Sequence, residues 1–177
     1  PMDEKPDVVI FDSERQLLGV IDHPKTEQEY YTQFVKDGSL YSRIETLDSL
    51  YAFKDKKLID QVLRQAFKDP YYMVRQYALE YLMDEEVKLK KYETEVVQLL
   101  KDSSSQVRSY ALAYLGVDGF EKYRAEFDKA LNDSSYLVVA SGISQFTGNE
   151  IELPASFLAN QKEVTNLNVV IMLAEYY

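Results

Sequence analysis

An aspartate followed six residues later by an arginine is the most regular chemical feature of the sequence. A carboxylate can accept the free N–H groups at the start of a helix, and it can pair with a guanidinium through two hydrogen bonds. We therefore expect a structural Asp–Arg ladder, with substrate binding as the alternative role. The ladder residues are Asp37, Arg43, Asp69, Arg75, Asp102, Arg108 and Asp133.

Catalytic groups in a recognisable pattern are absent from the sequence. The chain has no cysteine, and its single histidine, His23, cannot form a His-based zinc site by itself. The motifs H-E-x-x-H, G-x-x-x-x-G-K-S/T and G-x-S-x-G of zinc peptidases, nucleotide-binding proteins and serine hydrolases do not occur. We expect no catalytic residue, no metal ligand and no cofactor-binding residue in this chain.

The net charge narrows the range of partners. The sequence carries 30 acidic and 20 basic side chains, which gives a formal net charge of −10. Phosphate backbones and anionic membrane surfaces repel such a chain, and no apolar run of about 18 residues is present. We therefore expect neither a nucleic acid nor a membrane as a partner.

Helical hairpins must position the ladder residues. The four aspartates are 32, 33 and 31 residues apart, and the apolar positions that follow them, such as Val74, Ala78 and Leu82, lie on one side of a helix. Another helical pattern precedes each aspartate, at residues 27–36, 56–68, 89–101 and 120–132. A degenerate fifth copy begins near Asn160. Because one hairpin cannot bury its apolar side alone, the hairpins should stack into one array.

The first residues of the chain have a different pattern. Residues 8–11 and 17–21 are apolar and rich in β-branched side chains, and the polar residues between them are typical of a turn. We expect a short β-hairpin in residues 1–24, which either lies on the first helices or ends a preceding β-domain, and a helical repeat domain in residues 25–177. Because the sequence begins with Pro1 and ends within an apolar helical pattern, we expect it to be part of a longer protein.

Side chains on the second helix of each hairpin are the candidates for an interaction surface. Four of the 15 tyrosines occupy equivalent positions at the edge of the apolar side, where they either form an exposed recognition row or pack between successive helices. Small, polar or acidic residues beside them suit contact with a peptide or another domain. The candidates are Gln76, Tyr77, Glu80, Tyr81, Ser109, Tyr110, Ala113 and Tyr114, with Ile44, Asp48, Ala140 and Ser144 at equivalent positions.

The pattern Asp-x-x-x-x-Val-Arg followed by x-x-Ala-Leu-x-x-Leu, found at residues 69–82 and 102–115, resembles the HEAT repeat family. The resemblance covers about residues 26–177. It implies a right-handed α-α superhelix in which the second helices line the concave surface. The expected fold class is therefore all-α, a superhelix of HEAT-like repeats preceded by the short N-terminal β-hairpin.

A narrower resemblance joins the first segment to the array. The motif Val-Val-Ile-Phe-Asp12-x-x-x-x-Leu17-Leu is followed by helical patterns from near Glu27, with Arg43 in the first repeat. This arrangement is similar to the junction between a β-sandwich and a C-terminal HEAT-like domain in bacterial aminopeptidase N-like zinc metallopeptidases. This resemblance implies a non-catalytic domain that braces an active site located elsewhere in the parent chain or restricts access to it. It implies the parent's catalytic domain as a partner, peptide substrate as a further one, and zinc as the parent's cofactor.

A different class of protein remains open. The repeats alone also resemble free-standing HEAT-repeat interaction scaffolds and the HEAT-type phycobilin lyases. The reading frame upstream of residue 1 separates these alternatives, because only a peptidase parent would supply the H-E-x-x-H motif.

Overall fold

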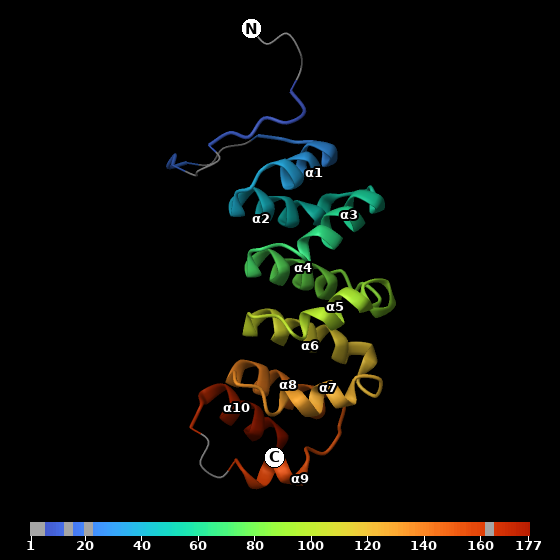
Figure 1. Cartoon of the computed structure of the whole chain (residues 1–177), viewed down its shortest axis with the longest axis vertical. Helices are drawn as coiled ribbons and strands as arrows, with labels where there is room; N and C mark the ends of the chain where they lie inside the picture. Colours follow the sequence, from blue (N-terminus) through green and yellow to red (C-terminus); the bar gives the residue numbers. More distant parts are fainter. Residues whose placement is uncertain (1–5, 13–15, 20–22, 162–164) are drawn as a thin grey trace. The chain divides into compact units, whose positions relative to one another are not determined.

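The computed structural model describes residues 6–12, 16–19, 23–161 and 165–177, without the side chain of residue 118. Residue contacts divide the chain into two compact units, Pro1–Tyr81 and Leu82–Tyr177, which are described separately here. All regular structure in the described residues is helical (Figure 1). Helix α4 (Tyr72–Asp84) begins in the first unit and ends in the second.

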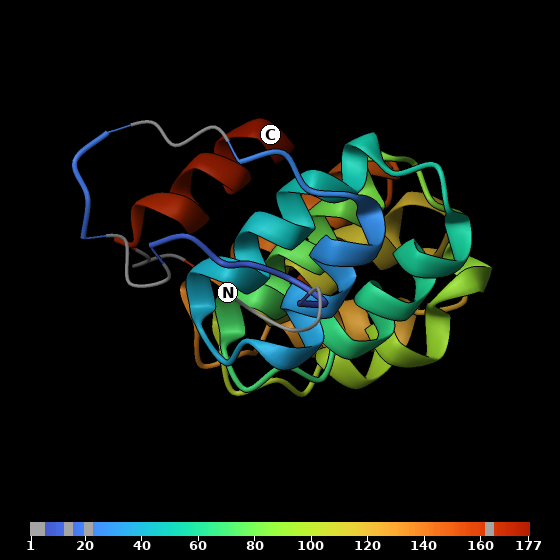
Figure 2. The ribbon, with the colours of Figure 1, turned by 90° about the horizontal axis from the view of Figure 1, so that it is seen from above.

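The first unit is built from capped helices that share one apolar core. Its elements are α1 (Glu27–Lys36), α2 (Leu40–Ser49), the 3-10 helix η1 (Leu50–Ala52), α3 (Lys56–Ala66) and most of α4. Thr26 and Glu29 form a capping box at the start of α1, and Ser39 and Asp55 cap α2 and α3, so free N–H groups at three helix starts are satisfied. Helix α1 packs against α2 and α3, and α1 and α2 lie side by side in both ribbon views (Figures 1 and 2).

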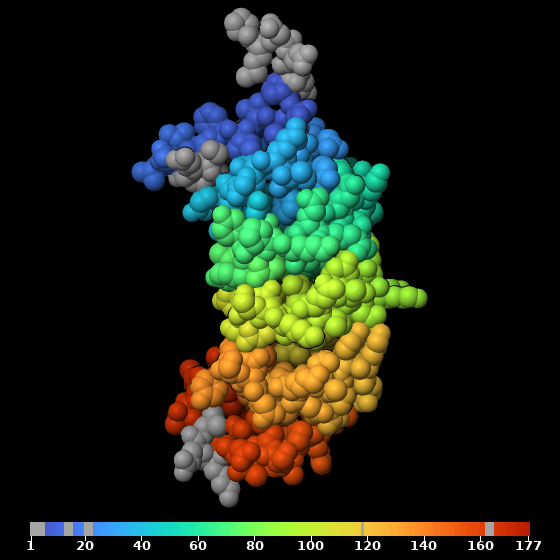
Figure 3. Space-filling view, viewed as in Figure 1, coloured from blue at the N-terminus to red at the C-terminus, as the bar shows by residue number. Residues whose placement is uncertain are grey.

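The second unit has helix α8 at its centre. Its elements are η2 (Leu89–Lys91), α5 (Glu93–Leu99), α6 (Ser105–Gly119), α7 (Arg124–Ala130), α8 (Tyr136–Gly148), α9 (Ala155–Ala159) and α10 (Leu167–Tyr176). Helix α8 packs against α6, α7 and α10, and the space-filling view shows a hollow between the layer of α6 and the layer of α7 and α8 (Figure 3). Gly142 allows the close approach of α8 to α7, because a Cβ at this position would lie 3.2 Å from the Cβ of Ala130. Phe127, Ile143 and Phe146 form the fully buried centre of this unit.

The expectation of an N-terminal β-hairpin is wrong for the residues that the structure describes. Residues 6–12 and 16–19 contain no strand, and Val20 and Ile21 lie outside the described residues. The Asp12 carboxylate accepts the backbone N–H groups of Gln16, in the expected turn, and of Leu17, at the start of the expected second strand. Leu17 and Leu18 remain exposed. A lone hairpin is marginal in water, and the exposed side chains of Val9, Phe11, Leu17 and Leu18 contribute little burial to compensate for the cost of ordering it.

The first helices of the hairpins differ from the sequence expectation at their ends. Helix α1 has the expected bounds, and α3 ends two residues early. The pattern at residues 89–101 is divided into η2 and α5, because buried Tyr92 has non-helical backbone angles between them. The pattern at 120–132 is shortened to α7. The degenerate fifth copy corresponds to α9 and α10, and the Asn166 side chain caps α10.

Candidate interaction surface

One arginine of the ladder bridges two hairpins in the first unit. Arg43, on α2, donates from Nη1 to both carboxylate oxygens of Asp69, at 2.8 and 3.1 Å. Asp69 ends the turn before α4, and one of its oxygens also accepts the N–H of Tyr71 at 2.9 Å. The exposed fractions of the Arg43 and Asp69 side chains are 17% and 5%, so water screens this pair little. The same carboxylate therefore caps a turn and holds the preceding hairpin.

The second unit repeats this arrangement in a bidentate form. Arg108, on α6, donates from Nη2 and Nε to the two oxygens of Asp133, at 2.7 and 3.0 Å. Its Nη1 donates to the carbonyl oxygens of Asp102 and Ser103, at 2.9 and 3.3 Å, in the turn of its own hairpin. Asp133 also accepts the N–H of Ser135 at 2.8 Å. Each bridge thus connects the second helix of one hairpin to the turn of the next.

The remaining ladder residues stabilise their own turns. Arg75 donates to the carbonyl oxygens of Asp69 and Pro70, at 2.6 and 3.2 Å. The Asp102 carboxylate accepts the N–H of Ser104 at 2.8 Å, and Asp37 accepts the N–H and the hydroxyl of Ser39. These contacts occupy the carboxylates and the guanidinium groups within the fold, which supports a structural role for them.

Two of the ladder carboxyl groups have lowered pKa values. Burial by itself would raise the pKa of Asp37, but hydrogen bonds from Ser42 and Ser39 and the charge of Arg43 outweigh it. Burial opposes the shift at Asp133 as well, where hydrogen bonds from Arg108 and from the N–H of Ser135 lower the pKa. Both carboxyl groups are therefore held in the ionised form that the turns require.

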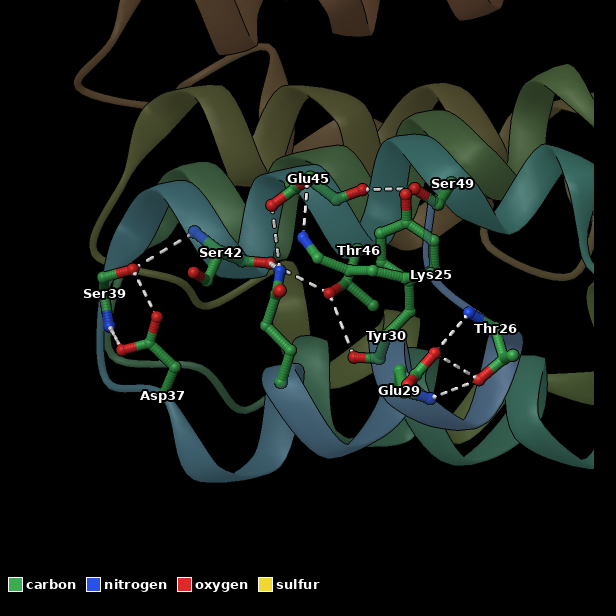
Figure 4. A network of polar contacts seen from close by, with 11 residues as sticks. Lys25, Thr26, Glu29, Tyr30, Asp37, Ser39, Ser42, Glu45, Thr46 and Ser49 are labelled. Carbon is green, nitrogen blue, oxygen red and sulfur yellow. Dashed lines mark hydrogen bonds and ion pairs between the residues drawn. The ribbon is translucent and has the colours of Figure 1, made fainter. Parts of the chain in front are cut away.

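A polar network that the sequence did not reveal lies between α1 and α2 (Figure 4). Gln33 is fully buried, and its amide nitrogen donates to the carbonyl oxygen of Ser42 and to a carboxylate oxygen of Glu45, both at 3.0 Å. The other Glu45 oxygen pairs with the ammonium of Lys25 at 2.8 Å. The hydroxyl of Thr46 donates to the carbonyl oxygens of Tyr30 and Ser42. Polar side chains therefore occupy positions that an apolar helix interface would fill with aliphatic ones.

The candidate interaction residues of the first unit form an acidic face. Gln76 donates to the Glu80 carboxylate at 2.9 Å, and Tyr77 beside them is half-buried. Tyr81 is buried, and its ring centroid lies 5.1 Å from that of Tyr51, which places Tyr81 in packing rather than in an exposed row. On α2, burial raises the pKa of Asp48, and the charges of Glu80 and Glu45 raise it further. Negative charge is thus concentrated on this face.

The equivalent residues of the second unit are small and hydroxylated. Ser109, Tyr110 and Ala113 are half-buried, and Tyr114 is buried with its hydroxyl donating to the carbonyl oxygen of Val87 at 2.6 Å. The Ser109 hydroxyl donates to the Ser141 hydroxyl at 3.0 Å and connects α6 to α8. Beside this contact is a shallow groove of about 290 Å³, whose lining includes Ser109, Ala140, Ser144, Asn168, Ile171 and Met172.

The described residues contain no group of three or more His, Cys, Asp or Glu side chains placed to hold a metal ion. His23 is exposed. No helix among the described residues has the length and apolar character needed to cross a membrane. The hydrogen bonds and ring contacts of the candidate interaction residues are those of a surface that packs against other protein groups. Comparison with known proteins found no family model and no curated protein that matches the chain.

Proposed function

We propose that this chain is a non-catalytic HEAT-type helical repeat domain of an aminopeptidase N-like zinc metallopeptidase. In this role the domain braces the catalytic domain of the parent chain or restricts access to its active site, and the parent supplies the zinc. The observation that carries the proposal is the bridge from an arginine in one hairpin to the aspartate in the next turn, which recurs in both units. An N-terminal β-hairpin is not part of the proposal.

The bridge supports this role because it fixes neighbouring hairpins to each other. Two hydrogen bonds join the guanidinium and the carboxylate in each bridge, and at Arg108 they come from two nitrogens, which fixes the orientation of α6 relative to the turn before α8. The acidic face around Asp48 and Glu80, and the small side chains around Ser109, then offer polar, closely approachable surfaces that suit contact with a large partner.

Two measurements test this proposal. The reading frame that surrounds the coding segment should contain an H-E-x-x-H motif upstream, and a start codon next to residue 1 without that motif would contradict the proposal. The purified chain, incubated with zinc and an aminoacyl chromogenic substrate, should release no product. Turnover that survives repurification and is abolished by a chelator would contradict the non-catalytic role.

The alternative is a free-standing interaction scaffold. The groove on α6, α8 and α10 favours it, because Ile171 and Val170 of α10 are exposed beside a lining of small side chains. Apolar side chains at the edge of a groove are typical of a surface that binds another protein. A start codon adjacent to residue 1 would favour this alternative over the peptidase domain.

A further inference from the structure

A cleft of about 420 Å³ lies in the second unit between the hairpin of α5 and α6 and the hairpin of α7 and α8. Its volume is within the range of protein pockets that bind ligands. Apolar side chains of Val97, Leu112 and Val138 contribute to its lining, next to the bridge between Arg108 and Asp133. The cleft therefore combines an apolar surface with charged groups that the fold holds in place.

The charge around this cleft is opposite to that of the chain as a whole. Arg108 is paired with Asp133, and Lys129 donates to Glu126 at 2.9 Å. A third cation, Lys101, is exposed, and among the described residues its ammonium has no ion pair. The lining thus carries one excess positive charge, although the net charge of the chain is −10. A ligand with a carboxylate next to an apolar group would complement it.

In the first unit, a carboxylate of the chain itself pairs with the lysine at the equivalent position of a hairpin. Lys36 immediately precedes the ladder residue Asp37, just as Lys101 precedes Asp102, and the Lys36 ammonium pairs with the carboxylate of Asp7. Asp7 belongs to a non-helical segment in which the apolar residues Val8 and Val9 follow it. An acidic and apolar segment of this same chain therefore already uses the lysine at this position of a hairpin.

We propose that the cleft of the second unit binds an acidic peptide segment. One carboxylate side chain of the peptide contacts Lys101 and Lys129 at the rim, and a neighbouring aliphatic or aromatic side chain packs against Val97, Leu112 and Val138. Clusters of cations beside an apolar surface recognise acidic motifs in this way. This binding site goes beyond the proposed function and does not depend on it, since a peptidase domain and a scaffold would both be able to carry it.

The probe is a fluorescent peptide with the sequence of residues 6–12, Pro-Asp-Val-Val-Ile-Phe-Asp, with both termini blocked so that only side chains carry charge. Titration with the full chain, followed by fluorescence anisotropy, should give saturable binding that high salt weakens. An analogue with asparagine in place of both aspartates should bind about tenfold more weakly or not at all. Equal binding of the two peptides would overturn the proposal.

Charge reversal of two lysines tests whether the acidic peptide binds in this cleft. The double variant Lys101→Glu and Lys129→Glu should bind the acidic peptide at least about tenfold more weakly. The matched control is Lys88→Glu and Lys90→Glu, because both lysines are exposed, lie outside the cleft and change the net charge equally. The control should bind within about twofold of the original chain. Equal weakening in both double variants would show a general charge effect and overturn the proposal.

A neutral substitution tests the apolar part of the cleft. Val97→Phe should occupy the space and weaken binding severalfold, while the melting temperature shows that the variant is folded. Sodium octanoate is the probe for a small carboxylate ligand. Octanoate binding that depends on Lys101, in the absence of peptide binding, would overturn the peptide proposal and leave a small-molecule site.

Discussion

The first hairpin of the first unit and the hairpins of the second unit use different side chains at the same buried positions. Ser42 and Thr46 lie five and nine residues after Asp37, and both are buried in the polar network around Gln33. In the second unit, the positions five and nine residues after the ladder aspartates hold Val107 and Ala111, and Val138 and Gly142, all buried.

The comparison shows that the shared feature is the bridge from an arginine of one hairpin to the aspartate in the next turn, rather than one kind of helix interface. The bridges connect successive hairpins whether the interior beside them is polar or apolar. They join Arg43 to Asp69 and Arg108 to Asp133. A polar interior is tolerated because its groups are paired, although the carbonyl oxygen of the Gln33 side chain accepts no hydrogen bond from the described residues. An unpaired buried acceptor costs about 1–3 kcal/mol. This cost applies to the side chain of Gln33 in the first hairpin.

The largest expected effect comes from the apolar interior of the second unit. Phe146→Ala should reduce the free energy of unfolding by about 3–5 kcal/mol, because the fully buried ring leaves a cavity beside Phe120, whose centroid lies 5.4 Å away. Urea denaturation followed by circular dichroism measures this loss. Phe146→Leu is the conservative control, and its loss should be smaller. A loss below about 1 kcal/mol for Phe146→Ala would contradict the assignment of this ring to the core.

The two bridges should differ in strength. Asp69→Ala should cost about 3 kcal/mol and Asp133→Ala about 2 kcal/mol, because the exposed fractions of the two carboxylate side chains are 5% and 19%. Each change leaves a largely buried guanidinium without its carboxylate. The control is Asp60→Ala, which removes a surface pair with Arg64 within α3 and should cost less than about 0.5 kcal/mol. Equal losses at Asp60 and Asp69 would remove the distinction between ladder and surface pairs.

The polar network of the first unit should respond less strongly. Lys25→Met should cost about 1–2 kcal/mol, since the lysine side chain is only 5% exposed and its loss removes the positive charge that pairs with the Glu45 carboxylate. The same substitution in a Glu45→Gln background should cost less, because the partner charge is already absent. A double-mutant cycle measures the difference. Identical costs in the two backgrounds would show that the pair contributes nothing.

The smallest expected effect is a gain. Since the pKa of Asp48 is raised in the folded chain, protonation of this group favours folding, and that contribution is lost as the pH rises through the folded pKa. At pH 7 the ionised Asp48 is therefore unfavourable, and Asp48→Asn should stabilise the chain by about 0.5 kcal/mol or less after solvent screening. The gain should vanish near pH 3, where the carboxyl group is protonated in both states. A gain for Asp48→Asn that persists at pH 3 would contradict this account.

Local signals explain why much of the helical pattern was predictable. An aspartate before an apolar helix pattern marks a turn because its carboxylate accepts the N–H group two residues later, just ahead of the helix, as Asp69, Asp102 and Asp133 do. The start of α1 is predictable from Thr26 and Glu29 for the same reason. These signals depend on residues only two or three positions apart, and the chain can satisfy them without help from distant parts.

Other features had weak or misleading signals. Residues 8–11 and 17–21 have the composition of strands, but strand pairing needs a covered surface, and the side chain of Asp12 took the N–H groups instead. The break at Tyr92 follows from burial of its ring, which a helical pattern does not report. The sequence contained one signal of the network around Gln33. Polar Ser42 and Thr46 stand at positions where the other repeat copies have aliphatic or small residues. The roles of Gln33 and Lys25 were not predictable from it.

The sequence by itself determined where the chain turns and that aspartate and arginine recur at these turns, because capping and helix periodicity act over a few residues. Only the tertiary structure decided which aspartate each arginine reaches, since Arg43 pairs with Asp69 in the following hairpin rather than with Asp37 in its own. It also decided that Tyr81 and Tyr114 are buried and that Lys101 lines a cleft. Burial and pairing across hairpins depend on how helices distant in the sequence pack against each other. A local sequence pattern does not encode that packing.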